Sequence, residues 1–135
     1  MTPRSLIVAG NARLAASESL LAAGHSLDAT YLAGYAAEFG LKGVIPARAG
    51  NRRRDEMLSG DLFRSAAGHN FDRLRDTLAR GFREAIPGDI VAAIRRVNAR
   101  WSTDFRYRSA TGNRSAATQV IQDGRTILDW AEGLL

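Results

Sequence analysis

The sequence predicts an all-α fold, a bundle of four to five helices within a single domain that spans residues 1–135. Only three prolines occur among the 135 residues, and alanine, leucine and arginine, which favour helices, are abundant. Apolar residues recur at spacings of three and four, and no alternating apolar–polar run reaches the length of a strand. The length is typical of one domain with one hydrophobic core.

The first predicted helix covers residues 4–23, and Gly24 follows it at a position where glycine commonly ends helices. Its core-facing side is a stripe of apolar and small residues, namely Ile7, Gly10, Leu14, Ser17 and Leu21. This pattern predicts an amphipathic helix that packs closely against a neighbour.

The second predicted helix runs from Leu27 to Ile45, with Ser26 as its N-cap and Pro46 as its end. It is apolar on nearly every face, so we expect it to be the central and most buried helix. Three glycines would each weaken an isolated helix by about 1 kcal/mol relative to alanine. We therefore expect close packing of another backbone at these three positions: Gly34, Gly40 and Gly43.

A long, polar connection rich in arginine and glycine is predicted over residues 46–70, and connections of this length are often functional. The third helix is expected over residues 71–82, the fourth after the sequence Pro87-Gly88-Asp89, and the fifth after Ser115. Their predicted core faces are Phe71, Leu74, Leu78 and Phe82; then Ile90, Ile94, Val97 and Trp101; and finally Val120, Gly124, Ile127 and Ala131.

Composition excludes several classes of site. The chain has no cysteine and two histidines, which excludes disulfides and thiolate chemistry and makes a transition-metal site improbable. No Walker loop, dinucleotide fingerprint or His-Glu-x-x-His pair occurs. We therefore expect no metal and no cofactor. No signal peptide or membrane span is evident, so a cytoplasmic location is expected.

The net charge of +5 is carried almost entirely by arginine, because Lys42 is the only lysine among 19 basic residues. Guanidinium groups pair with phosphates and stack on bases, so this bias is compatible with a nucleotide or RNA partner. A GC-rich genome would produce the same bias without any functional cause. Arg52, Arg53 and Arg54 form a run that is either a solvated loop or a patch that contacts phosphates.

Glu38 and Lys42 are charged residues, four positions apart, on the otherwise apolar second helix. A glutamate four residues before a lysine is the favourable order for a helical ion pair, and burial makes each charge depend on the other. Tyr31 and Tyr35 precede them on the same face. This ladder is either a structural polar network or a ligand-binding site that includes Tyr35, Glu38 and Lys42.

His69 follows Arg64 in the sequence Arg-Ser-Ala-Ala-Gly-His. A histidine that deprotonates a 2′-hydroxyl and an arginine that stabilises charge on the phosphate would suffice for RNA cleavage without metal. The alternative is that His69 caps the entrance to the third helix. Further along, Phe105-Arg106-Tyr107-Arg108 alternates rings with guanidinium groups, as base stacking and phosphate pairing would require. The alternative is that Phe105 and Tyr107 fill the end of the core with Trp101, which is expected there, while the arginines face water.

Three stretches, taken in order, resemble one branch of the HEPN family (higher eukaryotes and prokaryotes nucleotide-binding), the branch associated with nucleotidyltransferases. They are Tyr31 to Lys42, with its acidic residue and lysine; Gly68-His69-Asn-Phe-Asp-Arg-Leu74; and Trp101-Ser-Thr-Asp-Phe-Arg106-Tyr107. The resemblance implies an up-and-down bundle of four or five helices that often dimerises. It also implies partnership with nucleotidyltransferase domains, binding of nucleotides or RNA, or activity as a toxin ribonuclease in toxin–antitoxin pairs.

Ribonucleases of the family resemble one another in an Arg-x(4–6)-His motif on a late helix, but no histidine follows His69 here. The preferred hypothesis is a module, non-catalytic or dependent on a partner, that binds a nucleotide or RNA through Glu38, Lys42, His69, Arg106 and Tyr107. The alternatives are a metal-independent ribonuclease that uses Arg64 and His69, and a purely structural dimerisation or docking protein.

Overall fold

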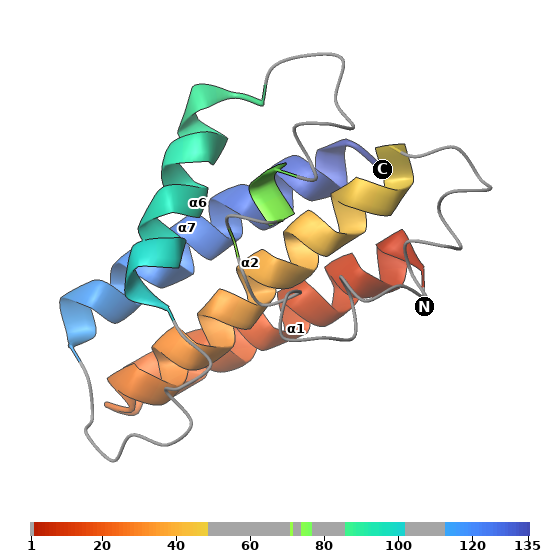
Figure 1. Cartoon of the computed structure of the whole chain (residues 1–135). Helices are drawn as coiled ribbons and strands as arrows, with labels where there is room; N and C mark the ends of the chain where they lie inside the picture. Colours follow the sequence, from red (N-terminus) through yellow and green to blue (C-terminus); the bar gives the residue numbers. More distant parts are fainter. Residues whose placement is uncertain (1, 49–70, 72–73, 77–85, 102–112) are drawn as a thin grey trace.

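The computed structural model describes residues 2–48, 71, 74–76, 86–101 and 113–135 and confirms the all-α bundle. Four helices have defined bounds: α1 (Pro3–Ala22), α2 (Ser26–Arg48), α6 (Gly88–Arg100) and α7 (Arg114–Gly133). The described ranges contain no strand. Helices α1, α2 and α7 lie along one another, and α6 crosses beside α2 and α7 (Figure 1).

Helices α1 and α2 form an antiparallel hairpin joined by only three residues, 23–25 (Figure 1). A capping box starts α1, in which the Thr2 hydroxyl accepts from the Ser5 amide and the Ser5 hydroxyl accepts from the Thr2 amide. Gly24 ends it in a left-handed conformation with a φ of 88°, as predicted. The amides of Gly24 and His25 donate to Leu21 and Leu20, the two bonds of a Schellman motif.

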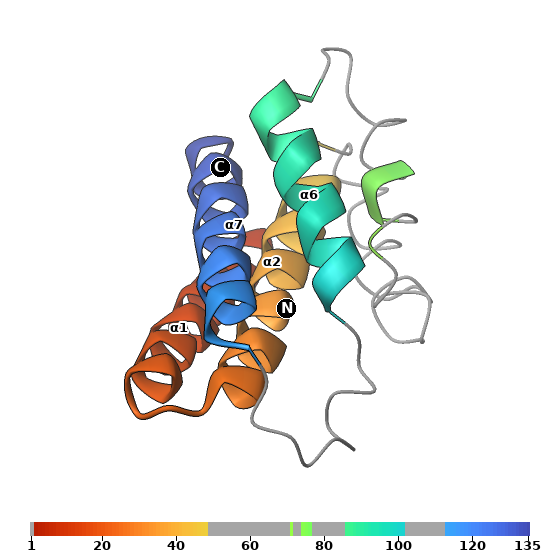
Figure 2. The same cartoon turned by 90° about the vertical axis from the view of Figure 1, so that its left-hand side faces the viewer.

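Helix α7 runs in the same direction as α2 and antiparallel to α1, and α6 lies on the side of the bundle away from α1 (Figure 2). The prediction that the fifth helix starts after Ser115 was late, because the Asn113 side chain accepts from the Ala116 amide and α7 already begins at Arg114. Arg114 in turn donates to the carbonyl of Leu21, near the carboxyl end of α1, where a cation is favourable.

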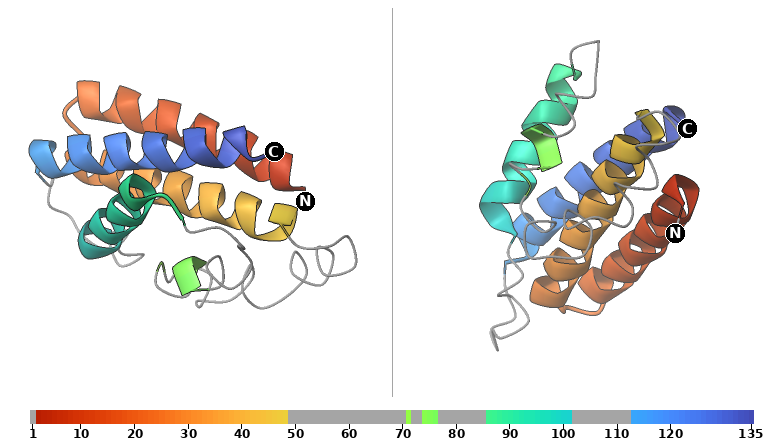
Figure 3. Two further views of the ribbon diagram at one scale, coloured as in Figure 1. Left: turned by 90° about the horizontal axis from the view of Figure 1, so that it is seen from above. Right: turned by 45° about the vertical axis from the view of Figure 1, so that its right-hand side comes forward.

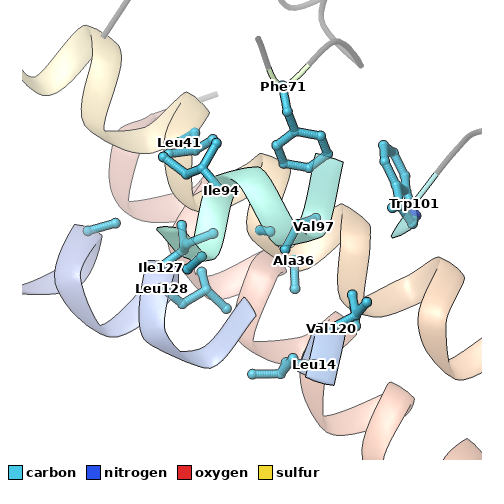
Figure 4. Packing of buried hydrophobic residues seen from close by; sticks show 14 of the residues in the cluster. Leu14, Ala36, Leu41, Phe71, Ile94, Val97, Trp101, Val120, Ile127 and Leu128 are labelled. Atoms are coloured by element: carbon cyan, nitrogen blue, oxygen red, sulfur yellow. The ribbon is translucent and has the colours of Figure 1, made fainter. Parts of the chain in front are cut away.

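The apolar stripes predicted for the described helices form the core (Figure 4). Leu14 of α1, Ala36 of α2 and Leu128 of α7 are fully buried where the three helices meet. Phe71 and Leu74, the described part of the predicted third core face, are buried as well, whereas Leu78 and Phe82 lie outside the described residues. Leu21 is the one predicted core residue of α1 that is only partly buried.

Small residues allow the three long helices to approach closely. A Cβ added at Gly43 would lie 3.2 Å from the backbone oxygen of Pro3, and one added at Gly40 would lie 3.6 Å from Cα of Leu128. These two glycines therefore have the expected role. Gly34 differs, since the group packed against it is the indole ring of Trp101 rather than a backbone.

The predicted bounds of the second helix were wrong at both ends. Ser26 is the first residue of α2 rather than its cap, and the helix continues through Pro46 to Arg48. A proline lacks the N–H that would bond the carbonyl four residues earlier, and its ring crowds that carbonyl, but α2 ends only two residues after Pro46. No helix of the described ranges has the length and apolar character needed to cross a membrane.

Candidate functional site

Glu38 and Lys42 form the predicted ion pair on α2, with 3.0 Å between Lys42 Nζ and Glu38 Oε2. Both side chains are buried, with exposed fractions of 1% for Glu38 and 6% for Lys42. A buried ion pair is retained only when each charge has a close partner, because desolvation costs several kcal/mol per ion. The spacing places both groups on one face of α2, and their order matches the helix dipole.

An aromatic cluster continues from this pair along α2. Tyr31, Tyr35 and Phe39 follow one another at intervals of four residues and are each half-buried. The Tyr31 and Tyr35 rings meet edge to face at 5.0 Å, with their hydroxyl oxygens 3.2 Å apart, and Tyr35 lies 6.1 Å from Phe39. Such a row of partly exposed rings beside charged groups has the chemistry to stack nucleobases.

Trp101 is buried, as predicted, and it anchors the cluster to the core. Its ring meets Tyr35 at 5.1 Å and Phe71 at 5.4 Å, both edge to face. Its indole N–H donates to the backbone carbonyl of Tyr31 at 2.9 Å. Figure 4 shows Trp101 and Phe71 at one edge of the buried cluster. The packing therefore fixes the end of α6 against the aromatic half of α2.

A second polar site joins α6 to α7 and was not predicted. Asp123 is buried, and both of its oxygens accept from the Arg96 guanidinium, at distances from 2.8 to 3.2 Å. Gln119 also donates to Asp123, at 3.2 Å. The hydrogen bonds and the negative charge of Asp123 raise the pKa of Arg96 above its usual value. The sequence offered one signal for this site, the carboxylate of Asp123 next to the predicted core face of the fifth helix. Its partner Arg96 lies 27 residues away in the chain.

Several predicted site residues lie outside the described ranges. They are Arg52, Arg53, Arg54, Arg64, His69, Arg106 and Tyr107. The structure therefore brings together Tyr35, Glu38 and Lys42 and leaves the other assignments as predictions. Within the described ranges, no group of three or more histidine, aspartate or glutamate side chains is arranged to hold a metal ion.

Comparison with known protein families gives one result that spans nearly the whole chain. The family model of the HEPN domain matches residues 4–134. Comparisons with curated proteins and with solved structures give no match. The matched range includes all four helices with defined bounds, the Glu38–Lys42 pair and the aromatic cluster. The chain therefore belongs to the HEPN domain family, whose members are helical modules related to nucleotides and RNA.

Proposed function

We propose that this HEPN domain binds a nucleotide or RNA on the face of α2 formed by Tyr35, Glu38 and Lys42. In this proposal it acts without a complete catalytic pair of its own, as a non-catalytic module or together with a nucleotidyltransferase-domain protein of a toxin–antitoxin type. Family membership supports the class of ligand. The observation that carries the proposal is the buried Glu38–Lys42 pair beside a row of half-buried aromatic rings.

The Glu38–Lys42 ion pair is costly to bury. Apolar side chains of similar volume stabilise a buried position as well as an ion pair does, and often better. The surrounding turns of α2 are apolar, with Ala36, Ala37 and Leu41 fully buried. Apolar packing alone therefore does not explain a lysine and a glutamate at this place, and in the proposal their charges serve the ligand.

The aromatic row of α2 offers a surface on which a base can stack. Base stacking on an aromatic ring contributes about 1–3 kcal/mol per base, and it tolerates any base. Tyr35 lies one turn before Glu38 and holds its ring between those of Tyr31 and Trp101. In the proposal, a base stacks on the exposed part of this row, and the ammonium group of Lys42 attracts the phosphate.

The remaining residues of the proposed site are predictions from the sequence alone. His69, Arg106 and Tyr107 would complete the ligand contacts, and Arg52, Arg53 and Arg54 would pair with phosphates. Phosphate contacts release counterions, so affinity for RNA should fall steeply as salt increases. Charge reversal at the three consecutive arginines should weaken binding and flatten this salt dependence if that loop takes part.

Calorimetric titration with ATP, GTP and a single-stranded RNA, at low and at physiological salt, tests the proposal. Tyr35→Leu should weaken binding by about tenfold because it removes the stacking surface, whereas Tyr35→Phe should retain most of the affinity. Lys42→Met should weaken binding, while Arg13→Met, which removes an exposed charge from α1, serves as the control. Thermal melts of each variant separate lost binding from lost folding. No binding of any of the three ligands at low salt would refute the proposal and favour a docking role.

A further inference from the structure

Helix α6 lies outside the three long helices, against α2 and α7 and away from α1 (Figure 3). Within the described residues, one polar contact that holds it is the Arg96 guanidinium on Asp123 of α7. The other is the indole hydrogen bond from Trp101 to the backbone of α2. Apolar burial has no directional preference and would by itself permit small shifts of α6, so the two polar contacts fix its position. The buried apolar face consists of Ile90, Ala93, Ile94 and Val97.

The Arg96–Asp123 contact restricts α6 strongly. Two guanidinium nitrogens, Nε and Nη2, donate to the two carboxylate oxygens at 2.8 to 3.2 Å. Such a planar fork fixes the orientation of the two groups as well as their distance. Asp123 is itself held in place, since it is buried and also accepts from Gln119, one turn earlier on α7. The fork therefore ties α6 to a fixed point on α7.

Trp101 follows any movement of α6. Its amide N–H donates to the Val97 carbonyl at 2.9 Å, so the residue continues the last turn of the helix. Its ring fills the space over Gly34, where even an added Cβ would overlap it. A shift of α6 toward α2 is therefore blocked, and a shift away would break the hydrogen bond to the Tyr31 carbonyl. The Tyr35 ring meets this indole at 5.1 Å, so a displaced indole also leaves Tyr35 without support.

We propose that Arg96 is a positioning residue for the proposed ligand face of α2, and that it acts through α6 and Trp101. The fork on Asp123 fixes α6, the last turn of α6 fixes the indole, and the indole fixes the Tyr35 ring. None of the described hydrogen bonds of Arg96 or Asp123 reaches α2, so the effect is indirect. The effect on the two rings follows from the packing, whereas its consequence for binding rests on the proposed function.

The indole N–H resonance of Trp101 reports the position of the ring without any ligand. Labelling with 15N gives two indole resonances, because Trp130 is the only other tryptophan, and Trp130→Phe assigns them. Arg96→Met should move the Trp101 resonance and speed its exchange with solvent about tenfold, because α6 is no longer fixed by a charge-assisted hydrogen bond. Arg96→Lys keeps the charge without the fork and should give an intermediate shift.

Two control variants separate positioning from a loss of charge or of stability. Arg95→Met removes the neighbouring exposed guanidinium and should leave the Trp101 resonance in place. Thr2→Ala removes the N-cap of α1, on the side of the bundle away from α6, and should lower stability without moving the resonance. An unmoved Trp101 resonance in Arg96→Met, or an equal shift in Thr2→Ala, would overturn the positioning role.

Calorimetry of the same variants with ATP and single-stranded RNA tests the consequence for binding. Arg96→Met should weaken binding by roughly threefold, less than Tyr35→Leu, because the ring is displaced rather than removed. Arg95→Met should bind as the wild type does. If the resonance moves in Arg96→Met but the wild type binds neither ligand, the positioning role stands and the proposed function fails. If the resonance moves and Arg96→Met binds as tightly as the wild type, the link from Arg96 to the ligand face is refuted.

Discussion

The indole ring of Trp101 lies directly against Gly34 of α2, so close that a Cβ at this position would overlap Cδ1 of the ring. The hydrogen bond to the Tyr31 carbonyl holds the indole in this place. The position of α6 relative to α2 therefore depends on the absence of a side chain at residue 34. Because the indole also packs against Tyr35, the same contact holds the Tyr35 ring in place.

Gly34→Ala should destabilise the protein by about 2–4 kcal/mol, because the indole must leave its position and break its hydrogen bond. The gain in helix propensity, about 1 kcal/mol, opposes this loss but is smaller. Gly88→Ala is the control, since nothing lies within 4 Å of its added Cβ, and it should change stability by less than about 1 kcal/mol. Urea denaturation, monitored by tryptophan fluorescence, measures the free energy of unfolding of both variants. Similar effects of the two substitutions would show that the indole does not pack as described.

Substitution of Arg96 should destabilise the protein more than substitution of its partner Asp123. Arg96→Met should cost about 1–3 kcal/mol because it leaves the buried Asp123 carboxylate with only Gln119 as a described donor. Asp123→Asn should cost less, since the amide oxygen still accepts from Arg96, which is 46% exposed and hydrated. Arg95 is the neighbouring exposed arginine, and Arg95→Met should change the free energy of unfolding by less than about 0.5 kcal/mol. Equal effects of Arg96→Met and Arg95→Met in chemical denaturation would contradict this account.

The Glu38–Lys42 pair should be strongly coupled. Glu38→Gln or Lys42→Met alone should cost about 3–5 kcal/mol, because each breaks an ion pair between two buried charges, and the double variant should cost less than their sum. Arg125 and Asp129 provide the comparison, with the same spacing on an exposed surface and 3.6 Å between their closest atoms. That pair should couple by less than about 1 kcal/mol. Strict additivity at positions 38 and 42 would count against a direct interaction.

Helix positions and the core could be predicted from the sequence because they follow from local periodicity. Ile7, Leu14, Ile94 and Ile127 recur with the helical repeat, and each is buried as expected. The left-handed conformation of Gly24 was also predictable, because it requires only a glycine after the last apolar turn. The Glu38–Lys42 contact is local too, being one turn of a single helix.

Contacts between distant segments could not be predicted in the same way. The pairing of Arg96 with Asp123 depends on how α6 packs on α7, and neither helix alone indicates it. The indole over Gly34 likewise depends on where α6 ends relative to α2. The sequence identified Trp101 as a core residue, but its partner required the packed structure.

The purified protein should show little or no ribonuclease activity in metal-free digestion of a mixed-sequence RNA. Cleavage requires a base held beside the 2′-hydroxyl and a cation held beside the same phosphate. Arg64 and His69 have the necessary side chains, but the glycine before His69 gives its backbone extra freedom, which a preorganised base should not have. Efficient cleavage by the wild type, abolished in His69→Ala, would instead establish this chain as a metal-independent ribonuclease.

In the proposed function a nucleotide or RNA binds at Lys42, and this side chain can be observed on its own. Because Lys42 is the only lysine, labelling lysine with 13C at Cε alone gives one carbon resonance, from this side chain, in a two-dimensional NMR spectrum. Its assignment can be verified by its shift in Glu38→Gln. We expect titration with ATP, GTP or single-stranded RNA to move this resonance in a saturable manner, at the concentration where calorimetry detects binding. Saturable binding that leaves the Lys42 resonance unmoved would place the ligand elsewhere and contradict the proposed site.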